Sequence, residues 1–147
     1  MKRRVLFVCT GNSIRSQMAE ALLREMAGER FEVVSAGTHP SGLHPAAVAT
    51  MREVGIDISG RRSRAVTVLA GEPFDHVVTV CDRAREICPA FPGAAHRHWS
   101  VADPTLSRAG GRERATAFRL VREDLADRIR RFLAEVDART DVPGPAV

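Results

Sequence analysis

The sequence predicts an α/β fold, with a four-stranded parallel sheet flanked by helices on both faces. Short apolar runs alternate along the chain with longer segments whose apolar residues recur at helical spacing. A chain of 147 residues, 44% hydrophobic and 27% charged, is long enough to bury one core. Alternating strands and helices favour parallel strands joined by right-handed crossovers. We expect a single domain over residues 1–138 and a flexible C-terminal tail over residues 139–147.

The first half of the chain contains two of the expected strands. The run Arg4–Cys9 is apolar after its first residue and short, as is typical of a central parallel strand. A helix is predicted over Ser16–Gly28, where the final glycine suits a C-cap. Phe31–Ala36 then predicts a second strand. His44–Val54 predicts a second helix, because Pro45 fits a first helical turn.

The second half repeats the pattern. Asp75–Cys81 predicts a third strand and Ala95–Ser100 a fourth. A last helix over about Arg112–Val136 carries apolar residues at steps of three and four: Phe118, Val121, Leu125, Ile129, Phe132 and Val136. Cys9, Cys81 and the segment after Ser100 all fall at the carboxyl ends of strands, where open α/β sheets bind their ligands. The sequence therefore predicts one site at this edge.

The composition argues against several classes of partner. The net charge is +4. The arginines are spread along the whole chain, which is more typical of a solvated surface than of a nucleic-acid-binding stripe. No apolar run approaches the ~18 residues of a membrane helix. The run Val5–Val8 is too short for the core of a secretory signal. We expect a cytoplasmic protein that binds neither nucleic acid nor membrane.

The segment Cys9–Arg15 joins a strand to a helix and has the composition of an oxyanion-binding loop. A helix start offers unpaired N–H groups and the positive end of its dipole. Gly11 and Asn12 tolerate left-handed backbone angles, and Arg15 can grip two oxyanion oxygens. The same field favours a nucleophilic thiolate at Cys9, to which Ser16 can donate a hydrogen bond. The residues predicted to bind the oxyanion are Thr10, Gly11, Asn12, Ser13, Ile14, Arg15 and Ser16.

The bare spacing C-x5-R is a weak signal in an arginine-rich chain, and a cysteine that ends a strand is often only a buried residue. The apolar strand, the small polar interior and the immediate helix make the oxyanion loop the better interpretation. Asp103, followed by Pro104, is the natural proton donor for a group leaving this loop, although Asp-Pro also occurs simply as a turn.

Cys81 and Cys88 are the other two cysteines, and they are either unrelated thiols or a redox pair. The spacing C-x6-C fits a zinc site poorly, and the histidines show no metal spacing, so we predict no metal and assign no histidine a catalytic role. Seven residues of helix rise ~10.5 Å, whereas a disulfide needs Cα atoms within ~7 Å. A helix between Cys81 and Cys88 must therefore unwind before they can bond.

Five segments carry a family resemblance: "VLFVCTGNSIRSQMAEAL" (Val5–Leu22), "SAGT" (Ser35–Thr38), "EVGIDIS" (Glu53–Ser59), "VVTVCDRAREICP" (Val77–Pro89) and "HWSVADP" (His98–Pro104). The chain resembles the low-molecular-weight protein tyrosine phosphatase superfamily and, within it, is most similar to the thioredoxin-coupled arsenate reductases. The resemblance spans most of the chain and fades after Pro104.

The resemblance implies reduction of arsenate to arsenite, hence a role in arsenic detoxification. It implies that Cys9 attacks arsenic, that Cys81 and then Cys88 pass on a disulfide, and that Arg15 and Asp103 complete the catalytic set. It also implies no tightly bound cofactor, thioredoxin or a similar dithiol protein as external reductant, and phosphate or sulfate as oxyanion analogues.

Two other functions remain open. A phosphatase of this superfamily would hydrolyse phosphomonoesters through a Cys9 phosphocysteine and ignore the other thiols, and weak phosphatase activity can accompany a reductase. The two extra cysteines and the lack of tyrosine favour the reductase. A thiol-based oxyanion-binding regulator without turnover is the third, and Asp103 argues against it because a binder needs no acid.

One departure concerns potassium. Some relatives bind this ion behind the loop through side chains that match Asn12, Glu20 and Ser35, plus an aspartate that aligns with Arg64. We predict that the Arg64 guanidinium replaces the charge of the ion beside Glu20. The alternative is an exposed arginine in a basic loop.

Overall fold

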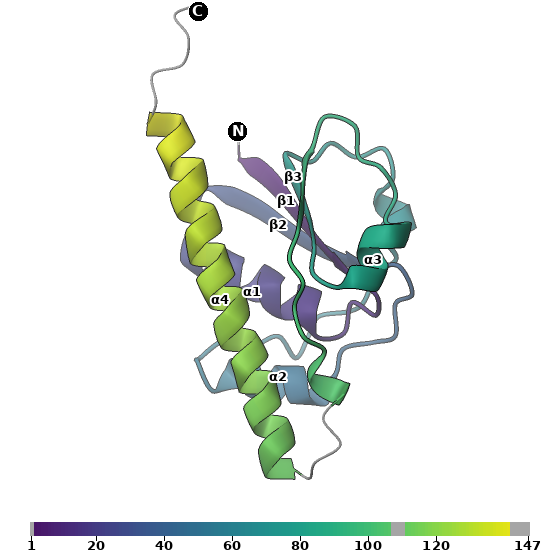
Figure 1. The fold of residues 1–147 in the computed structure, drawn as a ribbon, viewed down its shortest axis with the longest axis vertical. Helices are drawn as coiled ribbons and strands as arrows, with labels where there is room; N and C mark the ends of the chain where they lie inside the picture. The colour runs from purple at the N-terminus through teal and green to yellow at the C-terminus, as the bar shows by residue number, and fades with distance from the viewer. Residues whose placement is uncertain (1, 107–110, 142–147) are drawn as a thin grey trace, which may run out of the picture.

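The computed structural model describes residues 2–106 and 111–141. Strands β1 (Arg3–Cys9), β2 (Phe31–Gly37), β3 (His76–Thr79) and β4 (Ala95–His98) form one parallel sheet in the order β2-β1-β3-β4 (Figure 1). The predicted fold class is therefore confirmed. Because β1 lies between β2 and β3, its carboxyl end adjoins those of both neighbours.

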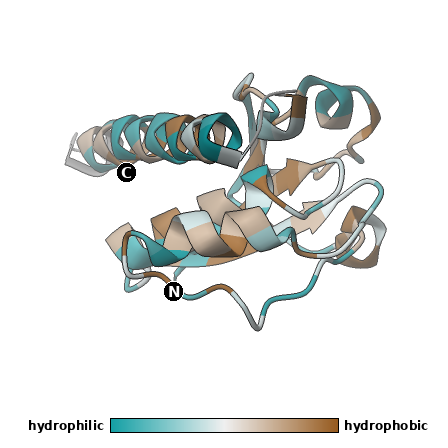
Figure 2. Ribbon diagram, turned by 90° about the horizontal axis from the view of Figure 1, so that it is seen from below, coloured by the Kyte–Doolittle hydropathy of each residue, from teal (hydrophilic) through white to brown (hydrophobic). Residues whose placement is uncertain are grey.

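Four helices flank this sheet: α1 (Arg15–Ala27), α2 (Pro45–Arg52), α3 (Asp82–Ile87) and α4 (Gly111–Asp141). Two short 3₁₀ turns, η1 (Val66–Leu69) and η2 (Pro104–Leu106), complete the described elements. Helix α4 runs the length of the molecule and contacts both α1 and α2 (Figure 1). Hydrophobic residues recur between hydrophilic ones along α4 (Figure 2), and the predicted apolar stripe from Phe118 to Val136 is buried.

Both faces of the sheet are covered. Leu6, Phe7 and Val8 follow one another in β1, and all three side chains have zero exposure. Because successive strand side chains point to opposite faces, burial of all three requires cover on both sides. Trp99 helps to provide that cover, since its ring lies 5.8 Å from the Phe7 ring. The strand that leads to Cys9 is thus fixed by the core.

Several predicted boundaries of strands and shorter helices move by one or two residues. The third strand ends at Thr79 rather than at Cys81, because Cys81 is the N-cap of α3 and its sulfur accepts the Ala84 N–H. The fourth strand ends at His98 rather than Ser100. Helix α2 begins at Pro45, and the His44 ring caps it by accepting the Ala46 N–H at 3.0 Å.

The structure describes only part of the C-terminal tail expected over residues 139–147. Helix α4 continues to Asp141, so residues 139–141 of the expected tail are helical. Residues 142–147 lie outside the described part of the chain. Across residues 2–106 and 111–141, no helix combines the length and the apolar character needed to cross a membrane.

Candidate active site

The loop between β1 and α1 folds back on Cys9. Asn12 takes a left-handed backbone angle, with φ of 48°, and its N–H donates to Cys9 Sγ at 3.2 Å. Gly11 does not use left-handed angles, contrary to expectation. It is needed for close approach instead, since a Cβ there would lie 2.6 Å from Ser41 Oγ.

The Asn12 side chain pins this turn from inside. Its Nδ2 donates to Ser16 Oγ at 2.8 Å and to Ser35 Oγ at 3.0 Å. Its Oδ1 accepts the backbone N–H of Arg64 at 3.0 Å. Asn12 is fully buried, so these bonds form away from water, where a lost partner is costly. These side-chain hydrogen bonds therefore fix the shape of the loop.

Cys9 lies at the bottom of the loop and is 3% exposed. Its sulfur is 2.8 Å from Ser16 Oγ. Because that hydroxyl accepts a hydrogen bond from Asn12, its own hydrogen is available to the sulfur. The Ser16 hydroxyl and the Asn12 N–H are then two donors aimed at one sulfur. Both donors are placed to hydrogen-bond the sulfur when it acts as a nucleophile.

Arg15 and Asp103 face each other at the mouth of the loop. Arg15 Nη1 donates to the carbonyl of Val101 at 3.0 Å, and its Nη2 lies 3.8 Å from Asp103 Oδ2. Asp103 Oδ1 accepts from the N–H and the hydroxyl of Thr105 at 2.9 and 2.6 Å. Asp103 Oδ2 lies on the arginine side, so this oxygen is the one turned toward the mouth of the loop.

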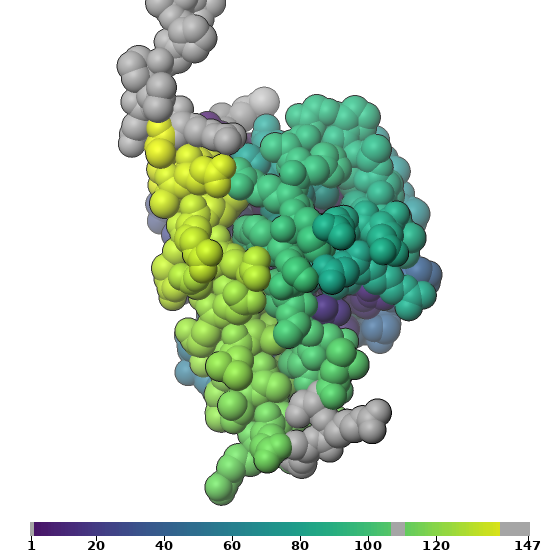
Figure 3. All heavy atoms as spheres, viewed as in Figure 1, coloured from purple at the N-terminus to yellow at the C-terminus, as the bar shows by residue number. Residues whose placement is uncertain are grey.

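A cavity of about 630 Å³ opens above the loop. Its wall includes four of the predicted residues: Thr10, Arg15, Cys81 and Asp103. Figure 3 shows purple N-terminal atoms at the bottom of the hollow between the teal α3 segment and the green chain that follows β4. The cavity therefore brings the end of β1, the start of α3 and the segment after β4 together.

Cys81 lies beside the loop. Its Sγ is 3.2 Å from Thr10 Oγ1, and Thr10 directly follows Cys9. This contact follows from the topology, because β1 and β3 are adjacent parallel strands. The second thiol is thus next to the first on the same edge of the sheet, and not across the sheet from it.

Cys88 lies at the other end of α3. Cys81 and Cys88 are the N-cap and C-cap of this helix, and all three cysteines are free thiols. The helical rise of ~1.5 Å per residue keeps the two caps beyond disulfide reach. Cys88 is about half-buried, and burial raises the pKa of its thiol. The segment between the two cysteines is thus a helix, which is the case in which their spacing forbids a direct bond.

Behind the loop, the prediction about Arg64 is wrong. The guanidinium that pairs with Glu20 belongs to Arg61, with Arg24 Nη2 also 3.3 Å from that carboxylate. Arg64 contributes its backbone N–H to Asn12 instead. Ser35 Oγ donates to the other Glu20 oxygen at 2.8 Å, so the loop, β2 and α1 share one polar network. The sequence alone does not show which of two arginines, three residues apart in a loop, pairs with Glu20.

Two further residues at the site, Gln17 and His98, were not predicted from the sequence as site residues. Gln17 is 1% exposed, and its amide donates to the Asn12 carbonyl at 3.2 Å and to that of Arg62 at 3.1 Å. His98 Nε2 lies 2.7 Å from Asp82 Oδ1, beside Cys81. A glutamine on the inner face of a helix and an aspartate directly after Cys81 were the available signals.

In the described ranges, no three His, Cys, Asp or Glu side chains gather as a metal site would require.

Comparison with known sequences gives a consistent picture. The family model for low molecular weight phosphotyrosine protein phosphatase matches residues 4–142. The chain is 40% identical over 132 residues to an arsenate reductase from Halalkalibacterium halodurans, covering 89% of this chain and 95% of that protein. It is likewise 40% identical over 129 residues to an arsenate reductase from Bacillus subtilis, covering 87% and 93%.

Solved structures agree. An arsenate reductase in a phosphate-binding state superposes with a TM-score of 0.79 at 32% identity, covering 90% of this chain and 98% of that one. A thioredoxin-dependent arsenate reductase from Corynebacterium glutamicum gives a TM-score of 0.72 at 29% identity, covering 94% of this chain and 63% of that one.

Proposed function

Because the chain belongs to the low molecular weight phosphotyrosine protein phosphatase family, we propose that it reduces arsenate to arsenite through a relay of three cysteines. One observation carries the proposal: the second thiol, Cys81, lies 3.2 Å from the hydroxyl of Thr10, the neighbour of Cys9. A phosphatase has no use for a second thiol there, because hydrolysis of a phosphomonoester consumes no electrons. The arsenate reductases among its relatives support the same conclusion.

The first step forms a bond between sulfur and arsenic. The loop N–H groups and Arg15 bind the arsenate oxygens, and the Cys9 thiolate attacks arsenic. Asp103 gives its proton to the departing oxygen, which leaves as water rather than as hydroxide. The hydrogen bonds from Ser16 and the Asn12 N–H support the attacking sulfur.

The second step reduces the arsenic. The Cys81 thiolate attacks Cys9 Sγ, the S–S bond forms and the S–As bond breaks. The electron pair of the S–As bond stays with arsenic, which leaves as arsenite, while two thiols are oxidised to one disulfide. The contact between Thr10 and Cys81 supports this step, since it holds the attacking sulfur beside the loop.

The third step moves the disulfide outwards. Cys88 attacks Cys81 Sγ and displaces Cys9 as a thiolate, which restores the loop for another turnover. Because Cys81 and Cys88 cap opposite ends of α3, this helix must unwind for the step to occur. An external dithiol protein then reduces the Cys81–Cys88 bond by exchange, and we propose thioredoxin for this role. Free thiols and a reductant of this kind fit the cytoplasm.

Arsenate reduction coupled to thioredoxin and thioredoxin reductase tests the proposal. Cys81→Ser and Cys88→Ser should each lose multiple turnover. After exposure to arsenate, Cys88→Ser should trap a Cys9–Cys81 disulfide that peptide mass mapping detects. Hydrolysis of para-nitrophenyl phosphate, which needs Cys9 alone among the three thiols, should persist weakly in both variants and disappear in Cys9→Ser.

The phosphatase remains the alternative because phosphate and arsenate are close in size and charge, so the loop itself does not separate them. Undiminished phosphatase activity in all variants except Cys9→Ser, without any disulfide that depends on arsenate, would favour hydrolysis of phosphomonoesters and reject the relay.

A further inference from the structure

Helix α3 has little packing of its own to hold it in place. Ala84 is the one buried residue among its six, and Ile87 is 47% exposed. A helix this short is marginal without outside support. Yet its N-cap, Cys81, must stay beside the loop if its sulfur is to attack Cys9. Some other contact has to fix the first turn of α3.

A polar cluster supplies that contact. Asp82 Oδ1 accepts hydrogen bonds from His98 Nε2 at 2.7 Å and from Ser100 Oγ at 3.0 Å. We name these three residues, Asp82, His98 and Ser100, the Asp82 clasp. The other ring nitrogen of His98 lies 2.7 Å from Thr79 Oγ1. A hydrogen on Nε2, with the threonine hydroxyl donating to Nδ1, satisfies both ring contacts.

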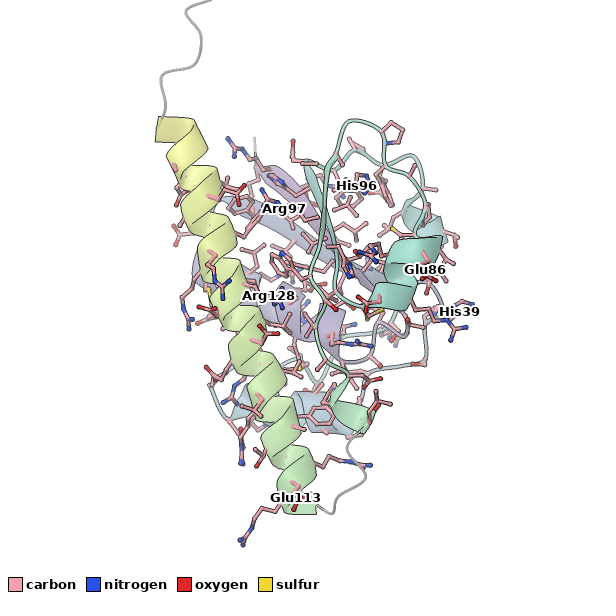
Figure 4. The ribbon with its side chains drawn as sticks, in the orientation of Figure 1. His39, Glu86, His96, Arg97, Glu113 and Arg128 are labelled. Carbon is pink, nitrogen blue, oxygen red and sulfur yellow. The ribbon has the colours of Figure 1, made fainter. Side chains whose placement is uncertain are left out.

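The far side of the clasp is firmly anchored. His98 ends β4 and pairs in register with Thr79 of β3. Its neighbour Arg97 makes two hydrogen bonds, at 2.9 and 3.1 Å, to the Glu135 carboxylate of α4. Figure 4 shows Arg97 between the sheet and α4, with Glu86 on α3 on the other side. The clasp therefore ties a helix that must unwind to a strand that is fixed on both sides.

We propose that Asp82 and His98 are positioning residues, which hold the first turn of α3 so that the Cys81 sulfur stays within reach of Cys9. The inference rests on the proposed relay and concerns its second step, in which the Cys81 thiolate attacks Cys9 Sγ, the S–S bond forms and the S–As bond breaks toward arsenic. Asp82 follows Cys81 directly, so its carboxylate is one residue from the thiol that it positions.

The charge of Asp82 suits this role. The hydrogen bonds from His98 and Ser100 lower the pKa of its carboxyl, which is therefore ionised at neutral pH and binds both donors strongly. The side chain is 66% exposed, so solvent moderates the strength of the contact. We expect a loss of about fivefold in the positioned step, and not an abolished one.

The test isolates the second step in the Cys88→Ser background. The Cys9–Cys81 disulfide is quantified by quench and mass mapping after arsenate is added. His98→Ala and Asp82→Ala should each slow its formation about fivefold, and the double variant should be no slower than either single one, because both remove the same contact. Asp82→Asn should restore most of the rate, since its amide oxygen still accepts both hydrogen bonds. His96→Ala, at the start of β4, is the matched control and should leave the rate unchanged.

A positioning role and a purely structural role predict different results for the hydrolysis of para-nitrophenyl phosphate. If the role is positioning, His98→Ala should retain this activity within about twofold, because the reaction uses Cys9 and not Cys81. Equal losses in hydrolysis and disulfide formation would overturn the positioning role, and so would unchanged rates in both assays. Circular dichroism and thermal melting establish that each variant is folded. His98→Ala and Asp82→Ala remove the same contact from opposite sides, so either variant carries the test if the other does not fold.

Failure of the relay and failure of the clasp are distinguishable. Oxidised dithiothreitol accepts two electrons from Cys9 and Cys81 and joins them without arsenate. If the Cys88→Ser protein forms the disulfide with this reagent but never with arsenate, the proposed function fails. The clasp variants should still show the fivefold slowing with this reagent, and equal rates there would reject the clasp.

Discussion

The loop after Cys9 and the segment from Cys81 to Cys88 lie side by side but are built in opposite ways. The loop is buried, and Asn12, Ser16 and Ser35 join it to α1 and β2 through short hydrogen bonds. The second segment is a six-residue helix with one buried residue and a few polar contacts at its start. One region is rigid and the other is only lightly fastened.

The difference follows from what each region must do. A group that binds a transition state gains from being arranged in advance, because no reorganisation is then needed during the reaction. A pair of thiols at opposite ends of a helix cannot bond until that helix opens. Low local stability is therefore a requirement of the second region, and high local stability is a requirement of the first.

Asn12→Ala should produce the largest effect, because it removes the centre of the rigid region. The variant loses two donated and two accepted hydrogen bonds in a fully buried place. We expect about 10²-fold lower activity and a loss of ~2–4 kcal/mol in the free energy of unfolding. Steady-state kinetics and urea titration measure the two effects.

Asn12→Gly separates the backbone contribution from that of the side chain. Glycine keeps the left-handed angle of 48° but none of the side-chain bonds. It should lose nearly as much activity as Asn12→Ala. A fully active glycine variant would show that backbone shape alone organises the loop.

The reactivity of Cys88 should depend on pH in a way that reports the helix. Burial raises the pKa of its thiol, so the nucleophilic thiolate is scarce at neutral pH and increases as pH rises. The measurement uses a protein that lacks the other two cysteines. At pH values below that pKa, the rate at which iodoacetamide alkylates Cys88 should increase about tenfold for each unit by which the pH rises. In guanidinium the same curve should move to lower pH, because the unfolded chain no longer buries the thiol. Superimposed curves would mean that α3 is already open.

Arg61→Gln probes the network that supports the loop from behind. The Glu20 carboxylate, 7% exposed, loses one of its two arginine partners, and we expect a loss of ~1–3 kcal/mol in stability. Wild type should melt at the same temperature in potassium and sodium chloride, since Arg61 already supplies the positive charge. The variant should be stabilised more by potassium. Arg62→Gln, an exposed neighbour, is the control. A potassium-specific stabilisation of wild type would contradict this interpretation.

The contrast between the regions also explains what could be predicted from sequence. The loop is local: Cys9, Asn12, Arg15 and Ser16 are within eight residues, and their types and spacing define the turn. The parallel sheet followed from the alternation of strands and helices, and its carboxyl edge was predicted to carry both Cys9 and Cys81. The structure adds the strand order, in which β1 lies beside β3 and Cys81 beside Thr10. These inferences rest on short-range chemistry and on general rules of topology.

Long-range side-chain pairing was beyond the sequence. Arg61 and Arg64 are three residues apart, and which of them reaches Glu20 depends on the course of a loop that no periodicity describes. The contact between Asp82 and His98 joins residues sixteen positions apart across a strand end. Gly11 was misjudged because its requirement is space beside Ser41, which only the folded chain reveals.

Glu86→Gly should give the smallest effect and tests the lightly fastened region directly. The residue is exposed on α3, where glycine weakens the helix by about 0.5–1 kcal/mol. If unwinding limits the Cys81–Cys88 bond, the open form becomes about two- to fivefold more populated, and the disulfide should form faster by the same factor. Oxidised dithiothreitol and mass mapping measure this rate in a Cys9→Ser background.

Glu25→Gly in α1 is the matched control, since it places the same substitution at an exposed position of a helix that the relay leaves intact. It should lower the melting temperature without changing the rate of disulfide formation. If Glu86→Gly also left that rate unchanged, opening of α3 would not be the slow step. The light fastening of this segment would then need another explanation, because a helix that opens faster than its thiols react gains nothing from being weak.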